Sequence, residues 1–513
     1  MEGFVSFMND ILWGPWFIYG IMLVGVFFTI IMKVPQLRFI KDMFKLMFTG
    51  QKSEKGISSF QALSIALSGR VGTGNIAGTA TAIGMGGPGA VFWMWAIAFL
   101  GAATAYVEST LAQIYKEEKE TEYRGGPAFY IEKGMGQKWF AVIFAVAALL
   151  AMLFLMPGVQ SNAIAGAMNN AFGLDEAVTG AIIIILLAFI IIGGVKSIAN
   201  AAQIIVPFMA LAYVLMALVI ILLNLSEVPA VIGLIFSSAF GAQEIFGGII
   251  GSAIAWGVKR GIYSNEAGQG TGAHPAAAAE VSHPAKQGLV QAASVYIDTL
   301  LICSATAFMI LFTGMYNVHD EKADPITVTH EQKDYEVLPT IFTGEFGSDD
   351  YSGEEQITFA QSIKEGAAYT QYAVDSSLPG FGAPFVAIAL FFFAFTTIMA
   401  YYYIAETNIA YLFTGTMEKV FIWIAKIAIL ITAFYGTIRT SDLAWAMGDV
   451  GLGLMVWINV IAILIIMKPA LVALKDYEAQ KKAGKDPTFD PRKLGIKNAK
   501  FWEERADRSD GKE

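Results

Sequence analysis

Residues 67–80 read LSGRVGTGNIAGTA and place four glycines, an arginine, an asparagine and several hydroxyl groups inside an otherwise apolar segment. Glycine permits the backbone to leave the helix and lets it approach a ligand closely. In lipid every backbone N–H and C=O group needs a partner, so a broken helix is tolerated only where it is buried or lines a cavity. The segment therefore predicts a binding site for a small ligand, built largely from backbone groups.

The two sides of this break suit opposite charges. The half-helix that starts at residues 72–75 presents free N–H groups and a positive dipole end, which favour a carboxylate. The carbonyl groups of Ser68 and Val71 lie just before the break and suit a small cation such as Na⁺. A glycine-rich helix packed tightly on its neighbours would also explain the glycines. Tight packing would not explain why Arg70 stands beside the glycines, so we favour the unwound site.

A second interrupted segment lies at residues 245–272, IFGGIIGSAIAWGVKRGIYSNEAGQGTG. Its early glycines and Ser252 weaken the helix, and Trp256 is large enough to wall a small cavity. We expect Lys259 and Arg260 in the cytoplasmic half, where they either extend to the inner interface or act as a gate. The polar run at 264–268 is expected to close the cytoplasmic pathway. Two interrupted helices in corresponding halves of a chain are typical of secondary transporters.

These segments belong to a chain with the composition of a polytopic membrane protein. It has 513 residues, of which 56% are hydrophobic and 15% charged. Its apolar runs reach the roughly 20 residues that cross a bilayer. We expect an all-α membrane protein with about eleven spans, near residues 11–32, 60–83, 89–114, 139–157, 178–194, 202–224, 245–268, 288–314, 384–411, 420–438 and 448–467.

Lysine and arginine predict the orientation of the spans. They gather in residues 33–55, 116–138 and 469–513, whereas residues 157–177 and 225–243 contain none. Short loops rich in these residues favour the cytoplasm. We therefore expect the N-terminus outside and the C-terminus in the cytoplasm of a cell that carries the protein in its plasma membrane, which fits an odd number of spans.

The chain divides into four expected parts. Residues 1–59 hold the first span and a basic loop, and residues 60–224 and 225–468 hold five spans each. The second set contains an acidic insertion, 315–382, expected outside as a loop or small cap. A solvated acidic loop is a simpler explanation of it than a cation-attracting entrance. The charged tail, 469–513, is expected to be mobile after one amphipathic helix, and either touches anionic lipid or is solvated.

Other classes of protein explain the sequence less well. No basic segment precedes the first apolar run, so no cleavable signal peptide is expected, and the single cysteine, Cys303, excludes an intrachain disulfide. Motifs of metalloproteases, serine hydrolases and phosphate-binding loops do not occur, so we expect neither an enzyme nor a nucleic-acid-binding protein. A channel is the serious alternative, since glycine-rich breaks also build pores. The paired breaks favour alternating access.

Two stretches carry a resemblance to a known family: GRVGTGNIAGTATAIGMGGPGAVFWMW (69–95) and GVKRGIYSNEAGQGTG (257–272). They resemble the sodium:alanine (alanine or glycine:cation) symporter family, and the similarity extends through nearly all the expected spans. The resemblance implies a LeuT-like architecture. Five spans (the second to sixth) and five inverted spans (the seventh to eleventh) would then follow one additional N-terminal helix. It also implies Na⁺ as coupling ion and no cofactor.

The resemblance assigns roles to the first break. Residues 71–75 are similar to the broken first core helix of the neurotransmitter:sodium symporters. By that similarity the amides of Thr73 and Gly74 match carboxylate-binding positions, and Asn75 matches a sodium-binding position. Arg70 departs from the pattern. We expect it to turn toward the cytoplasm and to pair with an acid, for which Asp298, Glu266 and Glu406 are the candidates.

The resemblance also implies a second, more widespread sodium site. It would use the carbonyls of Ser68 and Val71 with two hydroxyl groups of the ninth span, where Thr396 and Thr397 stand. Adjacent threonines can instead hydrogen-bond to the preceding helical turn, but their agreement with the break makes the cation site the better interpretation.

Four further polar residues lie within or beside the apolar runs. Gln160, after Pro157, corresponds to a helix that lines the substrate pocket, and is a candidate hydrogen-bond partner of the substrate. Asp298 is either functional or a salt-bridge partner of Arg70. His274 and His283 are expected to be surface or capping residues rather than metal ligands.

The sequence thus predicts a secondary active symporter that imports a small neutral amino acid with Na⁺. The candidate substrate-binding residues are Gly72, Thr73, Gly74, Asn75, Gln160, Ser252 and Trp256, and the candidate Na⁺ ligands are Ser68, Val71, Thr396 and Thr397. Alanine or glycine is the first expectation. Glutamine or another neutral amino acid, and coupling to H⁺ in place of Na⁺, stay open, as does the oligomeric state.

Overall fold

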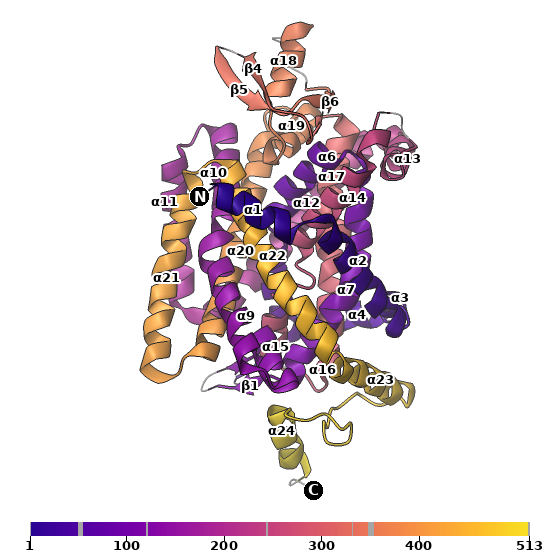
Figure 1. Ribbon diagram of the computed structural model, residues 1–513, viewed down its shortest axis with the longest axis vertical. Coiled ribbons are helices and arrows are strands. Elements are labelled where there is room, and N and C mark those ends of the chain that lie inside the picture. Colours follow the sequence, from indigo (N-terminus) through magenta and orange to yellow (C-terminus); the bar gives the residue numbers. More distant parts are fainter. Residues whose placement is uncertain are drawn as a thin grey trace.

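The computed structural model of the chain describes residues 2–49, 55–119, 122–242, 245–330, 332–346 and 353–510. Long helices run side by side along the long axis of the molecule (Figure 1). Within the described residues, seven apolar stretches of helix are long enough to cross a membrane. They are α7 (Gly89–Ile114), α9 to α10 (Lys138–Leu150, η3 at Ala151–Leu155, Pro157–Phe172), α12 (Gly194–Leu223), α16 to α17 (Pro284–Val295, η6 at Tyr296–Cys303, Ser304–Thr313), α20 (Gly382–Leu412), α21 (Gly415–Thr437) and α22 (Ser441–Ile466).

Three further apolar elements lie beside these stretches. Helices α1 (Glu2–Leu12) and α2 (Pro15–Ile31) form an apolar pair that is bent by 41°. Helix α11 (Glu176–Ile192) is apolar but shorter, as is the stretch made by η4 (Leu225–Glu227) and α13 (Val228–Ala239).

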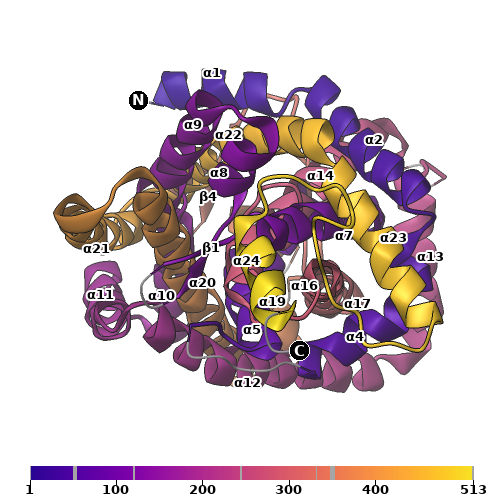
Figure 2. The same ribbon diagram turned by 90° about the horizontal axis from the view of Figure 1, so that it is seen from below.

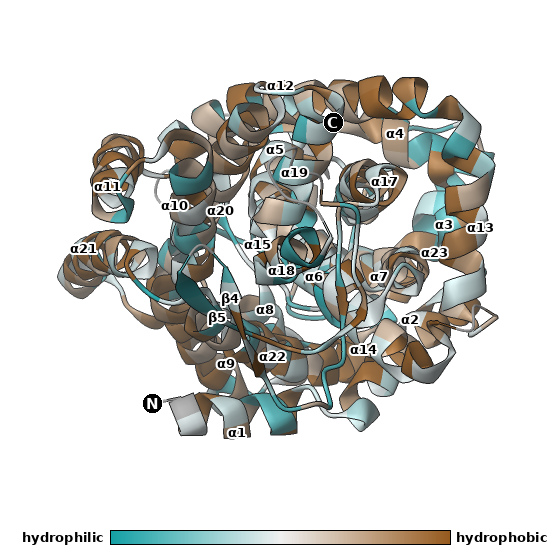
Figure 3. Ribbon diagram, turned by 90° about the horizontal axis from the view of Figure 1, so that it is seen from above, coloured by the Kyte–Doolittle hydropathy of each residue, from teal (hydrophilic) through white to brown (hydrophobic). Residues whose placement is uncertain are grey.

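The outer helices expose large apolar side chains. Phe189 on α11 is 76% exposed, Phe208 on α12 is 73% exposed, and Ile431 on α21 is 62% exposed. Hydrophobic residues follow these helices around the rim of the molecule (Figure 3). Soluble monomers rarely expose contiguous apolar surface on this scale. The rim is therefore the surface of a membrane protein.

The first predicted break is present. Helix α5 (Ser59–Arg70) ends at Arg70, and helical backbone resumes in η1 (Gly74–Gly78) and α6 (Thr79–Gly86). Ser58 begins α5 with a capping box, in which its hydroxyl accepts from the Gln61 N–H. The interruption, residues 71–73, is fully buried, as a break inside a membrane protein has to be.

The second break lies later in the chain than the glycines at 247–257 suggested. A short 3₁₀ turn, η5 (Gly247–Ile249), leads into α14 (Ile250–Asn265), which runs without interruption past Ser252 and Trp256. The chain unwinds at residues 266–272 and resumes as α15 (Ala273–Ala278). Glu266, Gly268 and Gly270 have positive φ angles of 55°, 88° and 84°, a backbone conformation that ends an α-helix.

Gly257 does not interrupt α14; it permits close packing against a neighbouring helix. A Cβ atom on Gly257 would lie 2.5 Å from the carbonyl oxygen of Ala90 on α7, so this position needs a residue without a side chain. The polar run at 264–268 thus spans the end of α14 and the start of the unwound stretch, between two helices.

The acidic insertion forms a small cap at one end of the bundle, drawn uppermost in Figure 1. Strands β3 (Val318–His319) and β6 (Thr340–Phe342) pair antiparallel, as do β4 (Ile326–His330) and β5 (Lys333–Val337). Helices α18 (Glu354–Ser362) and α19 (Ala367–Ser377) complete the cap. Of the two forms expected for this segment, the described residues show the cap.

The opposite end carries short elements and the C-terminus. They are α3 (Pro35–Arg38), α4 (Ile40–Phe48), the paired strands β1 (Glu117–Glu118) and β2 (Tyr123–Arg124), α8 (Pro127–Tyr130), η2 (Ile131–Met135), α23 (Lys468–Lys482) and α24 (Lys500–Asp510). Seen from this end, α24 lies across the middle of the bundle (Figure 2).

The expectation of a mobile tail is wrong for its described part. Trp502 of α24 is buried, and its Nε1 donates to the Gln113 carbonyl oxygen at 2.7 Å. Arg505 forms an ion pair of 2.6 Å with Glu280. An aromatic anchor within a charged segment holds the tail against the bundle, and the charge pattern alone does not reveal it.

Candidate substrate and cation site

The interruption after α5 brings together four of the candidate substrate-binding residues. The Thr73 N–H donates to Gln160 Oε1 at 3.0 Å, and the Gly72 N–H donates to Asn75 Oδ1 at 2.8 Å. Gln160 comes from α10, directly after Pro157, so the helix restart there positions it. Of the two amides that we expected to hold a carboxylate, that of Thr73 therefore donates to a side-chain amide oxygen, which is the neutral counterpart of a carboxylate oxygen.

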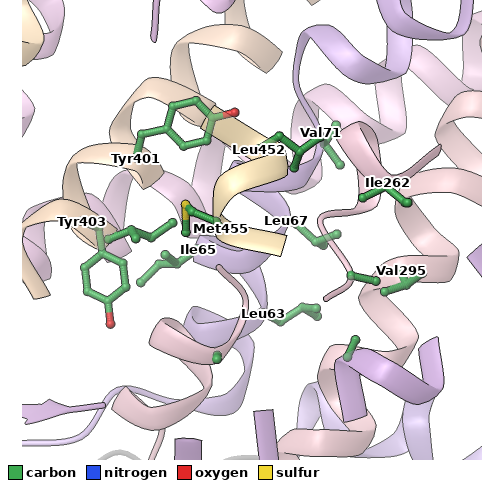
Figure 4. Packing of buried hydrophobic residues seen from close by; sticks show 14 of the residues in the cluster. Leu63, Ile65, Leu67, Val71, Ile262, Val295, Tyr401, Tyr403, Leu452 and Met455 are labelled. Atoms are coloured by element: carbon green, nitrogen blue, oxygen red, sulfur yellow. The ribbon is translucent and has the colours of Figure 1, made fainter. Parts of the chain in front are cut away.

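Gly74 marks the closest approach between the two broken helices. A Cβ atom on Gly74 would lie 3.0 Å from the Cα atom of Ser264 on α14. Buried apolar side chains of α5, α14, α20 and α22 surround the break, among them Leu67, Ile262, Tyr401 and Leu452 (Figure 4). A ligand at these amides would lie in a water-poor environment with little room.

Asp298 joins this site from η6. Its Oδ1 accepts from Asn75 Nδ2 at 2.6 Å, and its Oδ2 accepts from Ser264 Oγ at 2.9 Å and Thr299 Oγ1 at 2.7 Å. The salt bridge to Arg70 that we held open does not form among the described residues. Asp298 instead cross-links the two breaks. Ser264 was overlooked as a site residue, although its position beside the later glycines was the available signal.

The candidate cation site is only partly assembled. Thr397 Oγ1 donates to the Ser68 carbonyl oxygen at 2.9 Å, which connects α20 to the end of α5. Thr396 turns its hydroxyl toward Met209 Sδ on α12, at 4.0 Å, and toward the Phe393 carbonyl oxygen, at 3.0 Å. Thr397 Oγ1 also donates to the Phe393 carbonyl oxygen at 3.0 Å, so both hydroxyls form the bond to the preceding helical turn that we held as the alternative. Of the two, only Thr397 also bonds to α5 in the described part of the chain.

Ser252 and Trp256 lie away from the break. Trp256 Nε1 donates to Glu321 Oε2 of the cap at 2.9 Å, and the Ser252 carbonyl lies close to Gly86 at the end of α6. Trp256 precedes Ser264 by two turns, or about 12 Å along the helix axis. Ser252 and Trp256 therefore lie on the cap side of the unwound residues 266–272. They do not belong to the site at residues 72–75.

Lys259 and Arg260 also lie on the cap side of the break, not in the other half of the helix. Both pair with Asp449 of α22, Arg260 through two hydrogen bonds of 2.9 and 3.2 Å and Lys259 at 2.7 Å. The Arg260 guanidinium lies 4.3 Å from the ring centre of Trp445 and 5.1 Å from that of Trp256. Arg260 is 2% exposed, so it does not extend to a membrane interface.

Arg70 is buried on the other side of the break. Its Nη1 donates to the Gln291 carbonyl oxygen at 3.2 Å and contacts Ser294 Oγ. No carboxylate lies within 4 Å of it in the described part of the chain, so none of the three acids expected as its partner forms an ion pair with it. Glu406, one of the three, pairs with Arg124 at 2.9 Å.

Neither histidine is a surface residue. Both are buried, and His283 caps α16 because its Nδ1 accepts from the Ala285 N–H at 3.1 Å. Burial lowers the pKa of His283, which keeps this nitrogen free to accept. His274 Nδ1 lies 3.0 Å from the Gly270 carbonyl oxygen, beside the second break. Among the residues that the structure describes, no group of three His, Cys, Asp or Glu side chains could hold a metal ion.

Comparisons with known proteins identify the family of the chain. A family model described as the sodium:alanine symporter family matches residues 1–342 and 353–491. YrbD of Bacillus subtilis (strain 168) is 63% identical over 98% of both chains. The "Sodium/proton-dependent alanine carrier protein" of Bacillus sp. (strain PS3) is 54% identical over 90% of this chain and 97% of its own. "Sodium/alanine symporter AgcS" of Methanococcus maripaludis is 37% identical over 90% and 94%.

Among solved structures, a mutant manganese transporter of Eremococcus coleocola covers 86% of this chain and 83% of its own, at 13% identity and a TM-score of 0.48. A likeness at that level carries no argument about the fold. The family match extends over both broken helices, and it favours symport over a channel. The protein is a multi-pass membrane transporter, and the chain belongs to the sodium:alanine symporter family.

Proposed function

We propose that this chain is a Na⁺-coupled symporter that imports alanine across the plasma membrane, with a LeuT-like core. Adding the bent pair α1–α2, α11, and the broken helices α5–α6 and α14–α15 to the seven apolar stretches makes eleven spans. The cap would face outward, and the end that carries α24 would face the cytoplasm. The described parts of the two basic loops, 33–49, 116–119 and 122–138, support this orientation, since they lie toward the α24 end.

The observation that carries the proposal is the hydrogen bond between the Thr73 N–H and Gln160 Oε1. A substrate carboxylate would replace this oxygen on the amides of Thr73 and Gly74, at the positive end of the half-helix. The Gln160 side chain would then turn its Nε2 group to donate to the carboxylate. The names of two relatives, an alanine carrier and a sodium/alanine symporter, support alanine as the substrate.

Sodium would bind between α5 and α20. The carbonyl oxygens of Ser68 and Val71 and the hydroxyl oxygen of Thr397 are the ligands that we propose, because Thr397 already contacts Ser68 at 2.9 Å. Thr396, whose hydroxyl turns to α12, would support the helix and not contact the ion. Sodium can shift the equilibrium between the outward-open and inward-open conformations only if it binds one of them more tightly. The membrane potential adds a driving force for inward movement of about 2.3 kcal/mol per charge per 100 mV.

The ion pairs of Asp449 would form an outer gate. Arg260 and Lys259 tie the cap-side half of α14 to α22, and Trp256 and Trp445 stack around the Arg260 guanidinium. Rotation of one broken helix away from α22 would open the path from the cap to residues 72–75. Ser252 and Trp256 would then line the route and not the site.

Uptake by purified protein in liposomes tests the proposal. We expect an inward Na⁺ gradient to drive accumulation of radiolabelled alanine, and Gln160→Ala to reduce alanine uptake by about tenfold, as the loss of a hydrogen bond to a charged group predicts. Asn169→Ala on the same helix, whose side chain bonds only to its own loop at Leu174, is the control. If a pH gradient drives accumulation without Na⁺, the coupling ion is H⁺ and the sodium assignment is wrong. If the protein transports glutamine but not alanine, the substrate assignment is wrong.

A further inference from the structure

A cavity of about 470 Å³ lies at the α24 end of the molecule, away from both breaks. Its walls come from α4, the connection between α15 and α16, the start of α16, α23, the segment after α23, and α24. Five cationic side chains line it: Lys45, Lys286, Lys481, Lys485 and Arg505. Three acids, Asp42, Glu280 and Asp486, line it as well. The net charge of the lining is therefore positive.

Each of the three acids is already neutralised by one of these cations. Lys481 pairs with Asp42, Lys286 with Asp486 at 2.6 Å, and Arg505 with Glu280 at 2.6 Å. The remaining pair, Lys45 of α4 and Lys485 after α23, has no ion-pair partner within the part of the chain that the structure describes. Two lysines from distant segments thus line one cavity without an ion-pair partner among the described residues.

The cavity also adjoins the surface that faces lipid. Helix α4 is amphipathic: Phe44 is 46% exposed and Phe48 is 76% exposed on one side, whereas Lys45 and Thr49 border the cavity on another. A helix of this type lies in the membrane interface with its apolar face among the acyl chains. The headgroup of a phospholipid beside α4 would therefore be at the level of Lys45.

We propose that this cavity binds the phosphate headgroup of an anionic phospholipid, held between Lys45 and Lys485. The lysines contribute the charge-assisted contacts. Thr49 and Ser282 also line the cavity, but their hydroxyl groups donate to the carbonyl oxygens of Lys45 and Pro487 and would have to turn to reach the phosphate. Basic pockets at the cytoplasmic side of membrane proteins recognise such headgroups. Because Lys485 belongs to the tail and Lys45 to α4, the bound lipid would also join the tail to the membrane-interface helix.

Native mass spectrometry of the purified protein, titrated with phosphatidylglycerol, tests the inference. We expect one tightly bound lipid in the wild type and at least about tenfold weaker binding after combined Lys45→Gln and Lys485→Gln. The matched control combines Lys41→Gln with Lys497→Gln, which remove the same charge from α4 and from the tail but do not line the cavity. All four lysines are exposed, so both variants should fold.

Three outcomes would overturn the proposal. The first is binding unchanged in the Lys45/Lys485 variant. The second is an equal loss of lipid binding in the control variant, which would mean that positive charge anywhere on this surface attracts the anionic lipid. The third is equal binding of the zwitterionic phosphatidylcholine. A parallel titration with glycerol phosphate separates the two possible sources of the phosphate: if it binds as tightly as the lipid, the occupant is a soluble phosphate and the lipid assignment fails.

Discussion

Single residues decide which groups remain available for ligands at the first break. Asn75 and Gln160 accept from the backbone N–H groups of Gly72 and Thr73, and Asp298 collects donors from both broken helices. The substrate site and the link between the two helices are therefore one hydrogen-bond network. A ligand that displaces Gln160 Oε1 changes the contacts of α10 as well as those of α5.

The two adjacent threonines of α20 give the sharpest prediction at this scale. We expect Thr397→Ala to raise the Na⁺ concentration that half-saturates alanine uptake by about tenfold to a hundredfold, because a contact of a charged ion is lost. Thr396→Ala should leave it within about twofold, since that hydroxyl faces Met209. Uptake measured over a range of Na⁺ concentrations separates the two variants. Equal effects of both would contradict the assignment of Thr397 alone.

At the scale of helices, the first break was predictable from the sequence and the second only in part. Glycines beside Arg70 and Asn75 marked the unwound region, because polar residues at that depth need freed backbone groups. The glycines at 247–257 gave the same signal, but α14 is continuous there, and Gly257 permits close packing against α7. Packing between helices depends on the partner surface, which one segment does not reveal. The shift moved Arg260 to the cap side and removed Ser252 and Trp256 from the site.

The junction of α14 with α22 depends on Asp449. Asp449→Asn would leave Arg260 and Lys259 buried with a neutral partner, and breaking a buried ion pair from one side costs about 3 kcal/mol or more. We expect the melting temperature of the purified protein to fall by about 5 °C or more. Asp442→Asn is the control on the same helix, since its side chain is 81% exposed and lies 3.6 Å from Lys364. A melting temperature that falls equally in both variants would contradict the role of the buried pairs.

For the whole molecule, the two ends of the bundle have different structures. A folded cap contacts α14 at one end through Glu321 and Trp256. At the other end the tail lies across the bundle (Figure 2). Composition predicted that both segments are polar, but not that they dock, because docking depends on a few side chains such as Trp502 and Arg505. The transport machinery is thus enclosed between two accessory layers that belong to the same chain.

Docking of the tail can be measured by trypsin cleavage, since the connection between α23 and α24 contains Lys485, Arg492, Lys493 and Lys497. Trp502 is 1% exposed, and removal of a buried tryptophan side chain costs about 3 kcal/mol or more. Where cleavage follows the population of the open tail, Trp502→Ala should be cut about a hundredfold faster than the wild type. Trp139→Ala, which removes a tryptophan that is 63% exposed, should be cut at the wild-type rate. Rapid cleavage of the wild type itself would mean that the tail is not held against the bundle in solution.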